Sequence, residues 1–203
     1  MINSLDSMTL NEGMVILDAE FSFAGPTGRR ALCEVSVIGD NGETILHDYC
    51  NPGFSLENSD DPRNKRLSEK GLTDDLLSAG SSEQQVIYKL QRCLAKRNVV
   101  VWNLTWETTL IPEAFITAHS LFCAMKAAAP FIGRFVPRFN NHRWIKLWDA
   151  IDYLEIKNIP GIRHRAATDT IATLYVWNWT KEQTGTLIND FKGYSPELLR
   201  IER

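Results

Sequence analysis

The chain has 203 residues, a length that suits one globular domain with a core of its own. Hydrophobic residues make up 44% and charged residues 23%, and no apolar run is long enough to cross a bilayer, which excludes a membrane-spanning protein. The formal net charge of −3 does not indicate a nucleic-acid-binding protein, although a site built from carboxylates would itself make the charge more negative.

Cysteine usage and the N-terminus favour a cytoplasmic protein. Zinc sites need closely spaced ligands and disulfide frameworks are dense, whereas the cysteines here are widely spaced: Cys33, Cys50, Cys93 and Cys123. The first residues include Asp6 and Glu12 and lack the basic start and apolar stretch of a signal peptide. We therefore expect reduced, mostly buried thiols in a cytoplasmic chain.

The N-terminal part of the domain is predicted to be an antiparallel meander. Residues 14–21 are an apolar, β-prone run typical of a buried strand, and residues 30–38 and 43–50 follow as two more strands. The intervening residues 39–42 (GDNG) are typical of a hairpin, because they tolerate positive φ. Residues 51–70 are polar and predicted to be a loop.

A helix and a parallel strand are predicted next. Ser82 is a plausible N-cap, and the segment to residue 95 carries one apolar stripe of helical spacing. Residues 98–103 (NVVVWN) then read as a short buried strand. A helix that leads into a buried strand indicates a parallel strand added beside the first one.

The rest of the chain is predicted to be helical. Helices are expected over residues 108–122, 144–154 and 165–179. The whole chain, 1–203, is expected to form one α/β domain, a mixed sheet with helices on both faces and a core at about 14–180. Residues 185–203 are left as a tail that closes the domain or makes a subunit contact.

Two pairs of residues carry the chemistry. Asp18 and Glu20 are two apart on a strand and so point to the same side, where divalent cations would offset the cost of burying both carboxylates. His164 and Asp169 are five apart and share no helix face, but they converge if His164 lies in the loop before the last helix. The alternatives are surface acids at a strand end, and a loop histidine beside an Asp favoured by the helix dipole.

These motifs resemble the outer motifs of the DEDDh (DnaQ-like) 3′-to-5′ exonucleases, and the RNase T/TREX branch in particular. Residues 70–73 (KGLT), 100–103 (VVWN) and 144–150 (WIKLWDA) are similar to family segments in the same order. The resemblance implies an RNase H-like mixed five-stranded sheet, in which a meander of three strands is extended by parallel strands. It also implies two Mg²⁺ or Mn²⁺ ions at the scissile phosphate.

The resemblance assigns roles to the acidic residues. Asp18 would bridge both ions, Glu20 and Asp169 would hold the ion that binds the attacking water, and His164 would be the general base. The middle motif of the family ends in Asp, whereas Glu107 stands here. Because that acid is thought to act through water, the longer side chain should be tolerated, and we expect an active enzyme.

Residues near these motifs are candidates for contact with nucleic acid. The resemblance suggests that Phe21 and Phe23 stack on the terminal nucleotide, that Leu72 wedges against the last bases, and that Asn103 orders the motif loop or a phosphate. Arg163 or Arg165 would contact phosphate. Core packing for a Phe and solvation for the arginines are the alternatives. Residues 134–146 are basic without any Asp or Glu, which fits either a phosphate-binding segment or a solvated loop.

Several functions stay open. The favoured one is a two-metal-ion exonuclease acting on single strands or on the 3′ ends of duplexes, with DNA slightly preferred and nucleoside 5′-monophosphates released. An exoribonuclease of the RNase T or oligoribonuclease type is the nearest alternative. A weakly active binding module on the same fold, a proofreading subunit and a homodimer are also open.

Overall fold

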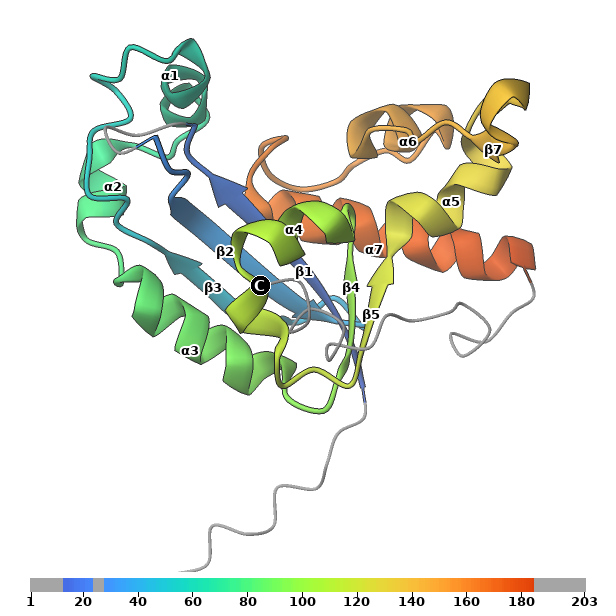
Figure 1. Ribbon diagram of the computed structural model, residues 1–203, viewed down its shortest axis with the longest axis horizontal. Helices are drawn as coiled ribbons and strands as arrows, with labels where there is room; N and C mark the ends of the chain where they lie inside the picture. The colour runs from blue at the N-terminus through green and yellow to red at the C-terminus, as the bar shows by residue number, and fades with distance from the viewer. Residues whose placement is uncertain (1–12, 24–27, 185–203) are drawn as a thin grey trace, which may run out of the picture.

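The computed structural model describes residues 13–23 and 28–184, and its centre is a five-stranded mixed sheet. The strand order is β3-β2-β1-β4-β5 (Figure 1). The strands are β1 (Met14–Phe21), β2 (Leu32–Gly39), β3 (Thr44–Tyr49), β4 (Asn98–Val101) and β5 (Ser120–Cys123). The tail at residues 185–203 and the first twelve residues, on which two sequence predictions rest, lie outside the described residues.

The sheet joins an antiparallel half to a parallel half at β1. β1 pairs antiparallel with β2, and β2 pairs antiparallel with β3. β4 pairs parallel with β1, and β5 pairs parallel with β4. The hairpin between β2 and β3 turns at Gly42, whose φ of +85° is one that glycine adopts without strain. The predicted meander and the parallel addition of a later strand are therefore confirmed.

Helices cover both faces of this sheet, as predicted. α3 (Glu83–Leu94) begins with a capping box between Ser82 and Gln85 and packs against β2 and β3. α7 (Ala166–Thr184) packs against β1 and β2 on the opposite face (Figure 1). α5 (Ala124–Ile132) and α6 (Leu147–Tyr153) pack in turn against α7.

The predicted helix over residues 108–122 is wrong. The chain there forms α4 (Leu104–Leu110), the 3₁₀ helix η1 (Pro112–Phe115) and then β5. Pro112 disfavours helical backbone at the residue before it, and Ile111 accordingly leaves the helix with φ −132° and ψ 54°. Burial of the strand that follows, through parallel pairing with β4, then decides in favour of β structure.

The polar segment at residues 51–70 is not only a loop. It contains α1 (Pro62–Glu69), which Asp61 caps by accepting a hydrogen bond from the backbone N–H of Arg63. A further short helix, α2 (Asp74–Ser78), begins after Thr73. α1 is polar, so the apolar periodicity that reveals most helices is weak in it, and its start signal is the Asp-Pro sequence.

The region between α5 and α6 is a small hairpin. β6 (Phe135–Val136) pairs antiparallel with β7 (Asn141–His142) across the 3₁₀ helix η2 (Pro137–Phe139). α6 begins at Leu147, so the first residues of the helix predicted over 144–154 are extended and Trp144 is exposed.

Two simpler predictions can be compared with the structure. All four cysteines are free thiols, three of them buried and Cys93 partly so. Within the described ranges, none of the helices has the length and apolar character needed to cross a membrane.

Candidate active site

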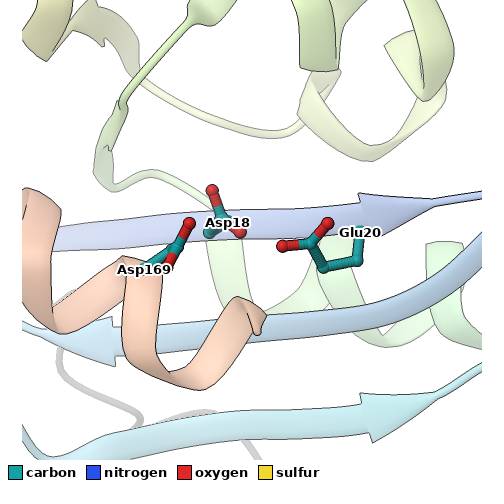
Figure 2. Close-up of side chains that lie close together, drawn as sticks. All are labelled: Asp18, Glu20 and Asp169. Carbon is teal, nitrogen blue, oxygen red and sulfur yellow. The ribbon is translucent and has the colours of Figure 1, made fainter. Parts of the chain in front are cut away.

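Three carboxylates from two elements gather at one end of the sheet. Asp18 and Glu20 lie on β1, and Asp169 lies in the first turns of α7. One oxygen of each lies within 4.8 Å of the others, and Figure 2 shows the three groups turned toward a common space. Carboxylate oxygens are the kind of ligand that hard divalent cations prefer.

Strand alternation and close helix packing bring these groups together. Asp18 and Glu20 share one face of β1, the face on which α7 packs. The fully buried Ala166 and Ala172 let α7 approach the sheet, and Ser36 on β2 lies 3.3 Å from Thr170 between hydroxyl oxygens. The helix therefore delivers Asp169 directly to the acidic face of β1.

Two hydrogen bonds orient Asp169. Its Oδ1 accepts one from the indole N–H of Trp148, at 3.0 Å, and one from the backbone N–H of His164, at 3.1 Å. Trp148 lies on α6, so the packing of α6 on α7 also serves the site. The residue is held from both sides before any ligand binds.

Burial and mutual repulsion make these carboxyl groups hold protons tightly. Desolvation, and then the charges of neighbouring carboxylates, raises the pKa of Asp18 and of Glu20 well above their ordinary values. Desolvation raises the pKa of Asp169 to about 6 despite its hydrogen bonds. Such a cluster is stabilised by whatever brings positive charge, either protons or a divalent cation.

Glu107, which the sequence analysis compared with the middle acid of the DEDDh family, is a buried carboxylate without a full set of partners. It lies on α4 with 4% of its surface exposed, and its Oε2 is one of two buried side-chain polar atoms in the described ranges that lack a hydrogen bond. Burial raises its pKa to about 8, and its charge is one of those that raise the pKa of Asp18. It stands outside the tight cluster, yet its charge acts on Asp18, so its unpaired oxygen fits an indirect contact to a hydrated cation.

His164 lies in the loop just before α7, the helix that carries Asp169. It is exposed, adopts the left-handed region with φ +64°, and its backbone N–H binds Asp169. Its imidazole does not join the carboxylate cluster. Partial burial lowers its pKa, and the positive charges of Lys70, Arg163 and Lys146 do the same. A lowered pKa favours the neutral imidazole, which is the form that can accept a proton.

Arg165 is engaged in the interior of the protein. Its guanidinium forms a two-point ion pair with Glu34 on β2, with Nε 2.9 Å from Oε2 and Nη2 3.1 Å from Oε1. It also donates to the Lys70 carbonyl and to the Tyr49 hydroxyl. In this arrangement Arg165 ties the start of α7 to the sheet and has few donors left for a phosphate.

Glu34 is a functional neighbour that the sequence analysis missed. It is fully buried opposite Glu20 on the adjacent strand, and it also accepts the backbone N–H of Ala166 and contacts His47 Nε2. The only signal in the sequence is one acidic residue within the apolar run of the second strand.

The remaining residues expected to meet substrate occupy different surroundings. Leu72 is fully buried in a small second core with Leu56 and Leu77, so its side chain is not accessible to the bases of a bound strand in this structure. Phe21 is buried in the main core. Phe23 is half-buried, with the Arg30 and Arg63 guanidinium groups 4.4 and 4.3 Å from its ring centre.

Asn103 and Arg163 neighbour segments that carry site residues. Asn103 precedes α4, the helix that carries Glu107, and its side chain makes no capping hydrogen bond. Arg163 forms an exposed ion pair with Asp152 and lies over the Trp148 ring at 4.5 Å.

Comparisons with known proteins identify the fold. No family model matches the chain, and no curated protein matches it in sequence. Several solved structures are similar. Exonuclease X in complex with 5′ overhanging duplex DNA has a TM-score of 0.61 at 15% identity, covering 87% of this chain and 95% of that one. S. pombe Pop2p in its Mg²⁺- and Mn²⁺-bound form has a TM-score of 0.63 at 13% identity, covering 85% and 84%.

E. coli Exonuclease I in complex with a dA16 oligonucleotide is a third similar structure, with a TM-score of 0.56 at 14% identity. The match covers 84% of this chain but 41% of that protein. None of the three is an RNase T or TREX protein, so the expected branch gains no support. The chain shares the RNase H-like fold, with its mixed five-stranded sheet, of these structures.

Proposed function

We propose that the protein is a metal-dependent 3′-to-5′ exonuclease that releases nucleoside 5′-monophosphates. The observation that carries the proposal is the buried cluster of Asp18, Glu20 and Asp169, with carboxylate oxygens within 4.8 Å of one another. Carboxylates placed so closely in a desolvated site repel each other, and divalent cations would neutralise them and polarise a scissile phosphate.

The chain's own residues would divide the work. Asp18, Glu20 and Asp169 would hold two ions, Mg²⁺ or Mn²⁺, with Glu107 contributing through water. His164 would accept the proton of the attacking water, because its lowered pKa keeps the imidazole neutral. The hydrogen bond from the His164 backbone N–H to Asp169 would hold the general base at a fixed position relative to the metal ligand.

DNA is proposed as the preferred substrate. Two of the similar structures were solved with DNA, one with an overhanging duplex and one with a single strand. Matched DNA and RNA oligonucleotides separate this proposal from an exoribonuclease. The cytoplasmic location and the homodimer stay predictions.

A 5′-labelled single strand tests the activity. With Mg²⁺ or Mn²⁺ the purified protein should shorten it stepwise from the 3′ end, and Asp18→Ala or His164→Ala should lower the rate by at least about 1000-fold. Circular dichroism should show that both variants keep the fold. Undiminished digestion by both variants would refute the proposed active site. Metal-dependent binding of the strand without cleavage by the wild type would indicate a non-catalytic binding module.

A further inference from the structure

The hairpin between α5 and α6 presents basic and aromatic side chains that neither the core nor the carboxylate site uses. We call residues 134–146 the hairpin platform. It contains arginine and lysine residues but no acidic residue, although the chain as a whole carries a net charge of −3. The platform therefore has a positive charge opposite in sign to the rest of the molecule, which suits a polyanionic partner.

Its three aromatic side chains are exposed. Phe139 is 70% exposed, Trp144 55% and Phe135 46%. Because so much of their surface is exposed, these three side chains add little to the buried core. Exposed aromatics that do not stabilise the fold are typical of binding surfaces.

Two of these rings, those of Phe139 and Trp144, line a cavity. This cavity of about 660 Å³ is lined by apolar and basic groups alike: Val136, Phe139, Asn141, His142, Arg143 and Trp144. The Arg138 guanidinium lies 5.6 Å from the Phe139 ring centre, and the Lys126 ammonium 5.8 Å from that of Trp144. Rings that accept a flat base, flanked by cations that accept phosphate, form a surface for single-stranded nucleic acid.

The platform leads along the chain into the helix that helps to hold the carboxylate site. Lys146, at its end, is one of the charges that lower the pKa of His164. Directly afterwards, α6 begins, and its Trp148 donates a hydrogen bond to Asp169. A strand whose 3′ end occupied the carboxylate cluster would thus meet Lys146 and then the platform as it left the site.

We propose that the hairpin platform binds the single-stranded part of the substrate away from its 3′ end, with bases stacked on Phe139 and Trp144 and phosphates paired with Arg138 and Arg143. The inference rests on the proposed exonuclease function and adds that long single strands are the preferred substrates. Stacking on a ring face is indifferent to base identity, so the preference concerns length and single-strandedness rather than sequence.

A surface of aromatic and basic residues is also compatible with anionic lipid. Interfacial membrane binding commonly uses an amphipathic helix, whereas here the side chains project from a two-stranded hairpin that leads into a phosphodiesterase-like site. Nucleic acid is therefore the favoured occupant, and lipid becomes an outcome of the test.

The test compares Phe139→Ala and Trp144→Ala with Tyr88→Ala. Tyr88 is 60% exposed on α3, which packs against β2 and β3, and is a matched control. Fluorescence anisotropy without divalent cation would give the Kd for a labelled strand of about 16 nucleotides and for one of about 4. The kcat/KM for the same strands would be measured in the presence of divalent cation. We expect each platform variant to raise the Kd for the long strand on the order of 10-fold and to leave the Kd for the short strand unchanged. Tyr88→Ala should change neither Kd.

Two results would overturn the proposal. One is an unchanged Kd for the long strand in both platform variants. The other is loss of binding to phosphatidylserine vesicles in these variants while oligonucleotide binding persists, which would assign the surface to lipid. Because Kd is measured without cleavage, a protein that lacks nuclease activity but shows the length-dependent loss would refute the proposed enzyme and retain the platform.

Discussion

Replacing Glu34 by Gln should destabilise the protein and impair the active site together. Four contacts converge on this carboxylate: two from Arg165, one from the backbone N–H of Ala166 and one with His47 Nε2. Glutamine replaces one of the two acceptor oxygens by an NH₂ group. Because Arg165 donates to both oxygens, that NH₂ group would face an Arg165 N–H in either orientation of the amide. The Arg165 charge, 14% exposed, would lose its counter-ion.

The expected cost is large because the pair is buried. Removing one partner of a buried ion pair typically costs about 3–5 kcal/mol, against a total stability of about 5–15 kcal/mol for a domain. Asp152→Asn is the matched control, since its ion pair with Arg163 has side chains more than half exposed and should be worth at most about 1 kcal/mol.

Urea unfolding followed by circular dichroism measures both variants. We expect the midpoint to fall strongly for Glu34→Gln at an unchanged slope, and hardly at all for Asp152→Asn. Burial raises the pKa of Glu34, but hydrogen bonds from His47 and Arg165 outweigh it and leave that pKa below its ordinary value. A group with a lowered pKa stabilises the fold above its unfolded pKa, so the difference from wild type should shrink as the pH falls through the folded pKa.

The exonuclease rate provides a second measurement. Because Arg165 and Ala166 begin the helix that carries Asp169, Glu34→Gln should also lower the rate. A change in stability below about 1 kcal/mol would refute the view that this pair anchors α7.

Three further outcomes follow from the site. The pKa values of Asp169, about 6, and Glu107, about 8, are raised, so the folded state holds protons that the unfolded chain releases. The stability of the metal-free protein should therefore fall as the pH rises through these values. In a thermal scan, Mn²⁺ should raise Tm more at pH 8 than at pH 5. Glu107→Gln should lower activity on the order of 10- to 100-fold while Glu107→Asp keeps it, and equal rates for both would contradict an indirect metal contact. Gly161 has a φ of +101°, and a Cβ added there would meet Thr168 Oγ1. Gly161→Ala should therefore lower the free energy of unfolding, measured in urea, by about 1–3 kcal/mol.

Local sequence was sufficient for the elements whose signals lie within a few residues. Alternation placed Asp18 and Glu20 on one face of the first strand, and hairpin residues placed the turn at Gly42. The spacing from His164 to Asp169 anticipated a loop residue followed by one in the next helix, as observed. These features depend on backbone geometry, which neighbouring residues largely determine.

Only the tertiary structure decided which side chains meet. Arg163 or Arg165 was expected at a phosphate, yet Arg165 pairs with Glu34, 131 residues away. Leu72 was expected at the bases but fills a small core. The segment at residues 120–123 became a strand because pairing with β4 buries it, although its own apolar run suits a helix as well. Burial and the choice of an ionic partner are properties of contacts between distant segments, so no local pattern contains them.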